Sequence, residues 1–531
     1  MNGSAAYLSS SRRQREIETI KQWMALCASQ HEANNCNTRR SKIQPERLID
    51  LSTEHGGPRL VPASSLDPSV EFAALSYRWG SAENLKTTLE NLSQMQEHIP
   101  CDSLPPTHRD AFELVKSIGF RYLWIDALCI IQDNGADKHR EILKMGSVYS
   151  NATLVIAAMT SKSTEKGLFS TATNSLPLAD DNFHDVMRAC RTMPRKHWES
   201  IISETLPLLC RGWAFQERLL ARRIIHFTDA ELVWECKGEI WCECGNIMKV
   251  GHLKRGINNL NAAFDLSAKS PAPERVRPMW RECVKTFSRR DLTDRKDRVF
   301  AIRGVAELLR PNCEDLYISG LWKDALPYDL LWRCDQSTVL GEKKSCHGPS
   351  WSWESVDCGI NWPSRHNDRW KGSLPIPCDS YFERGLSGPI DCAHAEMKEN
   401  CPDKSPISPG HIHLDTRIME ITIRKNTHTS LDISLLETDW HVEMTGGRRL
   451  PFYPDIQLTG EACFYYVEVV APPTNEVGWQ AGLIVRELSP SKLDGMHWYE
   501  RVGVAGEMSF DPTQFTSSFV PESPSRRVIL A

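Results

Sequence analysis

The residues best suited to chemistry lie at the ends of apolar segments. Ser76, Arg78 and Trp79 follow one such segment, and Asp126 closes another. The segments are apolar enough to be strands that are buried on both faces. Because ligands of open α/β sheets bind at the carboxyl ends of parallel strands, this placement predicts a binding site that the four side chains share.

A carboxylate and an aromatic ring are paired further along the chain. Glu217 lies four residues after Trp213, so the two side chains share one face of a predicted helix at 213–220. A binding role competes with a structural one, in which Glu217 only pairs with a neighbouring arginine and the tryptophan belongs to the core. The arginines in question are Arg78, Arg211 and Arg218.

The chain lacks the fingerprints of the common phosphate, dinucleotide and hydrolase sites. It has no Walker loop and no GxGxxG, HExxH or GxSxG motif. Cys129 would need a histidine base to act as a nucleophile, and none is adjacent in the sequence, so we expect a packed thiol. Ordinary enzyme classes are therefore disfavoured.

Cysteine and histidine gather in two stretches, Cys-x3-His-x4-Cys at 27–36 and Cys-x5-Cys-x-Cys-x7-His at 236–252. The residues concerned are Cys27, His31, Cys36, Cys236, Cys242, Cys244 and His252. Neither spacing is that of a standard paired zinc site, although thiolates and imidazole are zinc ligands. We therefore expect buried reduced thiols and no bound metal, with zinc as the alternative.

Alternating strands and helices must position these residues, which predicts a mostly parallel sheet. The predicted strands lie at 72–78, 122–126, 153–158, 223–227 and 231–236, and the predicted helices at about 107–118, 142–151 and 213–220. For the first helix, Thr107 is the expected N-cap and Gly119 the expected residue just past the C-terminus.

Composition and charge define the class of protein. Of the 531 residues, 41% are hydrophobic and 25% charged, which is ordinary for a globular chain. The net charge of −5 provides no positive field for nucleic acid or anionic membranes. The most apolar window, 123–131, is too short to cross a bilayer, and the N-terminal residues lack the apolar core of a secretory signal. The 18 cysteines suit a reducing compartment, so we expect a cytoplasmic protein.

Four motifs resemble, in order, the fungal heterokaryon incompatibility (HET) domain. They are ALSYRWG at 74–80, YLWIDALCIIQD at 122–133, the segment from Glu141 to Ala152, and RGWAFQERLL at 211–220. The resemblance covers about 72–220, and segments near 288–297, 317–322 and 349–353 look like those that accompany this domain. It implies a role in nonself recognition between fungal strains, in which the domain triggers programmed cell death.

The same motifs are distantly similar to Toll/interleukin-receptor (TIR) domains. Ser76 to Trp79 resembles the end of the first TIR strand, and the helix with Trp213 and Glu217 resembles the one whose glutamate is catalytic in TIR enzymes that hydrolyse NAD. Ala214 stands where that motif has Cys. The resemblance implies that Glu217 is catalytic and that Trp79 or Trp213 stacks on a ring of NAD. Because nicotinamide leaves as a neutral group, one carboxylate that stabilises the positive ribose could suffice.

Pattern and resemblance together predict an α/β domain of the TIR or flavodoxin type, with a mostly parallel sheet and flanking helices. The predicted parts are a lead-in at 1–71, the HET domain at 72–255, a mostly helical region at 256–396, a linker at 397–409 and a β-rich C-terminal region at 410–531. In the last of these, strands are expected at 411–423, 462–470 and 482–485.

Three functions remain open at this stage. The chain is expected to be a cell-death effector in nonself recognition, an NAD hydrolase that uses Glu217, or an assembly module without catalysis. A protein partner or self-association is expected, with no nucleic acid and no membrane span. No cofactor is expected, and NAD would enter only as a substrate.

Overall fold

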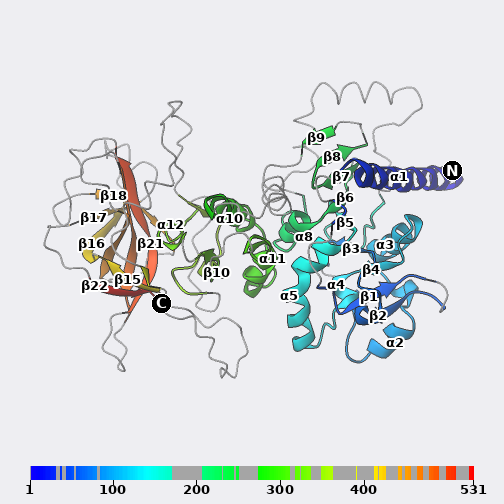
Figure 1. Ribbon diagram of the computed structural model, residues 1–531, viewed down its shortest axis with the longest axis horizontal. Helices are drawn as coiled ribbons and strands as arrows, with labels where there is room; N and C mark the ends of the chain where they lie inside the picture. The colour runs from blue at the N-terminus through cyan, green and yellow to red at the C-terminus, as the bar shows by residue number, and fades with distance from the viewer. Residues whose placement is uncertain are drawn as a thin grey trace. The chain divides into compact units, whose positions relative to one another are not determined.

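A nine-stranded sheet organises the N-terminal part of the chain in the computed structural model (Figure 1). Its strand order is β2 (Arg59–Pro62), β1 (Arg47–Asp50), β4 (Tyr122–Trp124), β3 (Phe72–Ser76), β5 (Leu154–Ala158), β6 (Arg223–Phe227), β7 (Leu232–Cys236), β8 (Glu239–Cys242) and β9 (Ile247–Lys249). The four central strands run parallel, with β4 and β5 on either side of β3. The predicted parallel strands near 72, 122 and 153 are therefore confirmed as neighbours.

The structure describes most of the N-terminal half of the chain and separate segments of the rest. The described residues are 2–31, 36–38, 43–52, 56–80, 84–169, 206–229, 231–243, 247–249, 273–310, 317–322, 325–335, 348–362, 390–391, 412–416, 418–425, 440–444, 449–455, 463–470, 478–488, 498–509 and 526–530. The predicted linker at 397–409 lies outside these residues, as do Cys244 and His252.

Antiparallel strands extend the sheet at both edges. Strands β1 and β2 form one edge, and β7, β8 and β9 form the other. Only residues 228–231 connect β6 to β7, and a parallel crossover needs about a dozen residues or more, so the chain must turn back as a hairpin. The α/β class with a parallel centre is confirmed.

Helices cover the sheet. Those of the N-terminal part are α1 (Asn2–Gln30), α2 (Leu92–Glu97), α3 (Pro106–Ser117), α4 (Asp126–Cys129), α5 (Gly135–Asn151), α8 (Ala214–Leu220) and α11 (Phe300–Leu309). Helices α5, α8 and α11 pack against one another, and α1 contacts β7. The predicted N-cap Thr107 is wrong, because Pro106 occupies the first turn of α3, where its missing N–H is not needed. Gly119 follows α3 at a φ of +93°, as expected for a helix end.

Two glycines allow α5 and α11 to approach closely. A Cβ atom built on Gly146 would lie 2.7 Å from the Gly304 Cα, a distance that no side chain tolerates. The Gly304 N–H donates a hydrogen bond to Gln216 Oε1 at 3.2 Å. Residues 300–309 are therefore an integral part of the helical layer beside α8.

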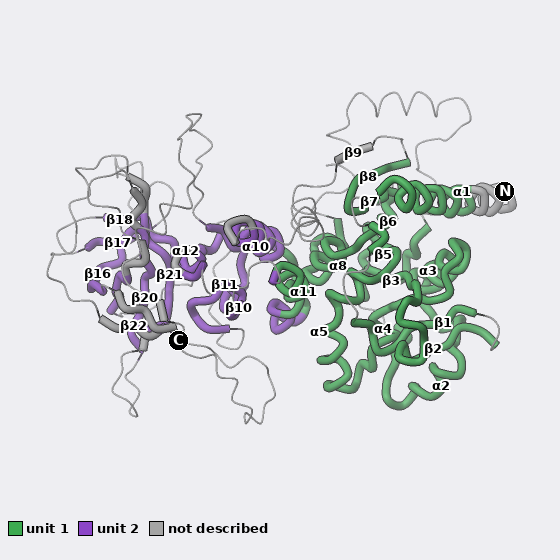
Figure 2. The backbone as a smooth tube through the Cα atoms, in the orientation of Figure 1, with its two compact units in different colours: residues 1–271, 290–293, 300–309 green, residues 272–289, 294–299, 310–531 purple. Residues whose placement is uncertain are grey.

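The chain forms two units that interleave in sequence (Figure 2). The first unit comprises residues 1–271, 290–293 and 300–309, and the second comprises residues 272–289, 294–299 and 310–531. The second unit begins with α10 (Pro273–Phe287) and contains α12 (Leu326–Asp329). Its short strand pairs are β10 (Tyr317–Ile318) with β11 (Leu321–Trp322), and β12 (Arg333–Cys334) with β13 (Ile360–Asn361).

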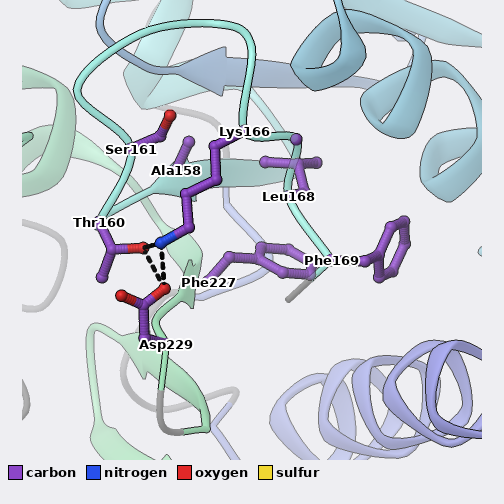
Figure 3. Close-up of a pocket in the computed structure, with 9 residues that line it drawn as sticks. Ala158, Thr160, Ser161, Lys166, Leu168, Phe169, Phe227 and Asp229 are labelled. Atoms are coloured by element: carbon purple, nitrogen blue, oxygen red, sulfur yellow. Dashed lines mark hydrogen bonds and ion pairs between the residues drawn. The ribbon is translucent and has the colours of Figure 1, made fainter. Parts of the chain in front are cut away.

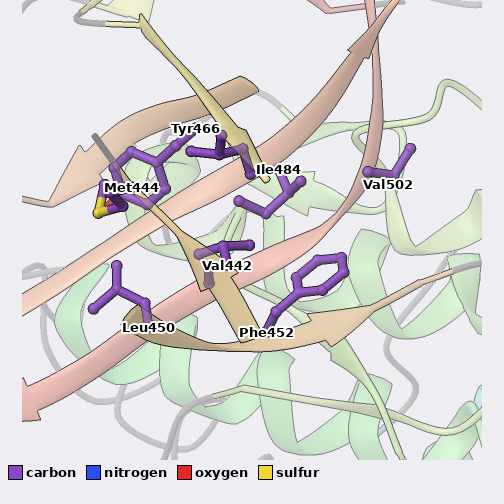
Figure 4. Close-up of a cluster of buried hydrophobic side chains, with 9 residues drawn as sticks. Val442, Met444, Leu450, Phe452, Tyr466, Ile484 and Val502 are labelled. Carbon is purple, nitrogen blue, oxygen red and sulfur yellow. The ribbon is translucent and has the colours of Figure 1, made fainter. Parts of the chain in front are cut away.

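A second nine-stranded sheet forms the β-rich C-terminal region. Its order is β14 (Ile390–Asp391), β15 (Ile412–Thr416), β22 (Arg526–Leu530), β21 (Trp498–Ser509), β18 (Arg449–Pro454), β17 (Trp440–Glu443), β16 (Ile418–Lys425), β19 (Phe464–Val470) and β20 (Gly478–Glu487). Because β20 also pairs with β21, six of these strands close into a ring. The single strand expected at 411–423 is in fact two strands, which pair with different neighbours. Buried side chains of this region form one hydrophobic cluster (Figure 4).

Thiols outnumber disulfides among the described cysteines. Cys334 and Cys358 of the second unit are disulfide-bonded, and nine other cysteines are free. Within the described segments, no helix is long and apolar enough to cross a membrane.

Candidate active site

Glu217 lies in the first turn of α8 and is held at the carboxyl end of a central strand. Its carboxylate accepts a hydrogen bond from the hydroxyl of Ser76, the last residue of β3. The Glu217 side chain is buried, at 2% exposure, and Ser76 is buried with it. Helix α8 and strand β3 thus bring together two residues 141 positions apart in sequence.

The turn before α8 fixes the position of this helix. The Gly212 N–H donates to the Asp291 carbonyl at 2.7 Å, and the Asp291 N–H donates to the Cys210 carbonyl at 2.6 Å. A Cβ atom on Gly212 would lie 2.5 Å from the Cδ2 atom of Leu292. A larger residue there would force the Leu292 side chain to move and would crowd the Asp291 carbonyl, which lies 3.3 Å from the Cβ position.

Two further side chains surround the Glu217 carboxyl group. The Tyr149 hydroxyl, from α5, donates to the Leu75 carbonyl at 3.0 Å and also interacts with the carboxylate. Arg211 donates to the Tyr77 carbonyl and acts on Glu217 through its charge. Burial disfavours the charge of Arg211, but the carboxylates of Glu217 and Asp126 outweigh this effect and raise its pKa.

The Glu217 carboxyl group exchanges its proton near neutral pH. Burial raises the pKa of Glu217 to about 7, while the charge of Arg211 and the hydrogen bond from Ser76 oppose the rise. The negative charge of Asp126 adds to it. A buried carboxyl group with this pKa is typical of acid, base and electrostatic roles in active sites.

Asp126 connects the strand end to Trp79. Its Oδ1 accepts from the Ala127 N–H at 2.7 Å, and its Oδ2 accepts from the Trp79 indole N–H at 2.8 Å. The expectation that Asp126 lies within a strand is wrong, since β4 ends at Trp124 and Asp126 begins the short helix α4. A helix start places backbone N–H groups within reach of a carboxylate, which explains this position.

The remaining predicted site residues differ in their surroundings. Trp79 is half-buried, and the Arg78 guanidinium donates to the Pro207 carbonyl at 3.0 Å. Trp213 is buried at the start of α8. Arg218 pairs with Glu235 at 2.8 Å, so among the three arginines considered above it is Arg211 that acts on Glu217.

Tyr149 and Tyr77 were not identified as site residues from the sequence. Both belong to motifs that carry the HET resemblance, and both are buried next to a carboxylate: Tyr149 beside Glu217 and Tyr77 beside Asp126. Burial and the adjacent charge raise the pKa of each phenol well above its ordinary value, so both are hydrogen-bond donors. A buried tyrosine in an otherwise apolar pattern was the available signal.

A small pocket opens at the ends of β5 and β6 (Figure 3). Thr160 and Asp229 share a hydrogen bond of 2.9 Å, and the Lys166 ammonium group reaches both of them. Apolar side chains, among them Leu168 and Phe227, line the remainder. The residues that line this pocket do not include Glu217.

The cysteine stretches are arranged differently from the sequence grouping. Cys236 lies with Cys27, His31 and Cys36, and the ligand atoms of these four buried residues all lie within 4.8 Å of one another. Cys129 is fully buried, and burial raises the pKa of its thiol, which agrees with a packed side chain.

Comparison with known proteins identifies one region. Residues 72–217 match the family model described as Heterokaryon incompatibility protein (HET). No curated protein and no solved structure matches the chain. The match confirms the HET domain, and the matched range ends at Glu217 and contains Ser76 and Asp126.

Proposed function

We propose that this chain, which carries a HET domain at 72–217, acts in nonself recognition between fungal strains and triggers programmed cell death. The family match carries the proposal, because the candidate site lies within the matched range. The protein acts in the cytoplasm, where free thiols persist, together with a protein partner or a second copy of itself.

For the molecular step we favour hydrolysis of NAD at Glu217. Water replaces nicotinamide on the ribose: the bond from C1′ to the nicotinamide nitrogen breaks, its electron pair leaves with nicotinamide, and ADP-ribose and a proton are released. The ribose becomes positive in the transition state, and a carboxylate beside it lowers the barrier. The supporting observation is the Glu217 carboxyl group at the end of β3, bonded to Ser76.

Each neighbour has a role in this proposal. Ser76 and Tyr149 orient the Glu217 carboxylate, and the charge of Arg211 favours its ionised form. The Trp79 indole, which donates a hydrogen bond to Asp126, offers a face on which a ring of NAD stacks. Since Glu217 is buried, NAD reaches it only after the structure around the carboxylate opens.

The burial of Glu217 also favours a second candidate, an assembly module without catalysis. In that case the cluster around Glu217 only fixes α8 to the sheet, and cell death follows from self-association. The two candidates share the HET domain and differ in whether the carboxylate meets a substrate.

The full chain expressed in a fungal host separates these possibilities. Glu217→Gln keeps the shape of the side chain and removes its charge, so catalysis predicts loss of toxicity and of nicotinamide release by the purified protein, measured by mass spectrometry. The rate in the unaltered protein should rise with pH through about 7, as Glu217 ionises.

Two control variants make the result specific. Glu243→Gln removes another carboxyl group whose pKa burial raises to about 7, and it should remain toxic. Gly212→Val, which collides with Leu292, should abolish toxicity under either mechanism. If Glu217→Gln is toxic while the NAD level stays unchanged, NAD hydrolysis is excluded and assembly is favoured. If the unaltered chain is not toxic, the role in cell death is contradicted.

A further inference from the structure

Four potential metal ligands converge beneath the N-terminal helix. Cys27 lies near the end of α1, His31 and Cys36 follow it, and Cys236 is the last residue of β7. The Cys236 Sγ atom lies 3.2 Å from His31 Nδ1, although the two residues are 205 positions apart in sequence. All four are buried, and their ligand atoms lie within 4.8 Å of one another.

These distances suit a tetrahedral ion. Zinc binds thiolate sulfur at about 2.3 Å and imidazole nitrogen at about 2.0–2.1 Å, so three sulfurs and one nitrogen at the corners of a tetrahedron are about 3.5–3.8 Å apart. Three sulfurs and one imidazole form a structural zinc set, and thiolates select zinc over the harder divalent ions.

The surrounding groups are those that hold metal ligands in place. Glu239 Oε2 lies 3.4 Å from His31 Nε2, so a carboxylate faces the ring nitrogen opposite the one that points at Cys236. The Glu239 N–H donates to Cys236 Sγ at 3.3 Å. The backbone of Lys237 supplies a further hydrogen bond to Cys36. N–H donors of this kind stabilise sulfur in its thiolate form.

The charge of Arg223 also suits a zinc ion bound by three thiolates. Its guanidinium is buried at 4% exposure, and Nε donates to Cys27 Sγ at 3.3 Å. Its other contact is with the Asn37 side-chain oxygen, and among the described residues no carboxylate pairs with it. A divalent ion with three thiolates and a neutral imidazole has a net charge of about −1, which a single buried guanidinium balances.

We propose that Cys27, His31, Cys36 and Cys236 bind one zinc ion. The ion fastens the end of α1 and Cys36 to strand β7, in the antiparallel part of the sheet. The site is separate from Glu217, and its existence does not depend on the proposed function.

The test uses the full chain, purified in a reducing buffer without chelator or added metal. Elemental analysis by inductively coupled plasma mass spectrometry should find about one zinc per chain. Cys236→Ala and His31→Ala should each lose most of it. Cys101→Ala, which removes a free thiol outside the cluster, should keep the zinc content of the unaltered chain.

Two measurements on the unaltered chain test the proposal even if a variant fails to fold. Cobalt exchanged into the protein should give the visible absorption of a tetrahedral thiolate site. Three thiols should be protected from a thiol reagent and become reactive once a chelator removes the metal, with a lower melting temperature. A folded chain without metal whose three thiols react freely, or in which two of them form a disulfide, would overturn the proposal.

Discussion

Two buried sites combine a carboxylate with an arginine, and the arginine has a different role in each. In the second unit, Arg501 donates from Nε to Asp455 at 2.7 Å and from its other nitrogens to main-chain carbonyls, and both side chains have 0% exposure. In the first unit, Arg211 donates to a main-chain carbonyl, and the bond to Glu217 comes from Ser76.

This difference separates a carboxylate in a direct ion pair from one that receives its hydrogen bond from a hydroxyl group. Direct pairing fixes the geometry of Asp455 and Arg501, and the rings and carbonyls around them leave the guanidinium no freedom. Glu217 instead receives a hydroxyl hydrogen bond and a nearby charge, and burial keeps its pKa at about 7. Two buried carboxyl groups thus differ in the type of donor that holds them, a guanidinium for Asp455 and a hydroxyl for Glu217.

The largest effect on the unfolding free energy is expected when the Asp455–Arg501 ion pair loses its arginine. Arg501→Met leaves the Asp455 carboxylate buried without a partner, which should cost about 3–5 kcal/mol of unfolding free energy, measured by urea unfolding of the full chain. Arg486→Met is the matched control, since its partly exposed pair with Glu500 should be worth less than about 1 kcal/mol. Similar losses in the two variants would contradict the comparison.

Glu217 should make stability depend on pH. Its folded-state pKa of about 7 exceeds the ordinary 4.5, so the stability it contributes is full at low pH and is lost as pH rises from about 4.5 to 7. As pH rises from about 5 to 8, the unfolding free energy of Glu217→Gln should therefore increase by on the order of 2 kcal/mol relative to that of the unaltered chain. Other buried carboxyl groups are present in both proteins, so their contributions to the pH dependence cancel in the comparison. Parallel pH profiles of the two unfolding free energies would contradict the shifted pKa.

Tyr149→Phe should have a smaller effect on the same group. It removes the hydroxyl that bonds to the Leu75 carbonyl, at a cost of about 1 kcal/mol. Because that hydroxyl also lowers the pKa of Glu217, its loss should move the pH dependence of stability to higher pH. An unchanged pH dependence would mean that Tyr149 does not donate to the carboxylate.

The smallest effect is expected in the pocket of Figure 3. Lys166 and Asp229 are both largely exposed, so Lys166→Met should change the unfolding free energy by less than about 0.5 kcal/mol. Thermal unfolding measures this change. A loss comparable to that of Arg501→Met would show that exposure does not govern the strength of these pairs.

Local pattern was enough to predict much of the fold. Strand β6 was predicted with both its ends, because apolar residues that run without interruption between polar ones mark a strand buried on both faces. The C-terminal part of helix α5 was predicted from the spacing of Ile142, Met145 and Tyr149, but its first turns from Gly135 were not. The position of Glu217 on a helix with Trp213 was predicted from the same periodicity.

Features that depend on which segments meet could not be predicted in this way. Cys236 joins His31 only because β7 lies beside α1, and the sequence places these residues far apart. The hydrogen bonds of Asp126 depend on where β4 ends, and a difference of two residues, between 124 and the predicted 126, decides whether Asp126 lies in a strand or at a helix start. Local propensity contains no information on such long-range pairings.

The contribution of residues 290–293 and 300–309 to the first unit has a consequence for where this part of the chain can be cut. A gene fusion or a recombination event that carried only the codons of residues 1–271 would leave Gly146 without Gly304 and Gly212 without Asp291. The HET domain of this protein is therefore not a portable cassette. A fragment that keeps these contacts must extend to residue 309, and it therefore includes α10 of the second unit.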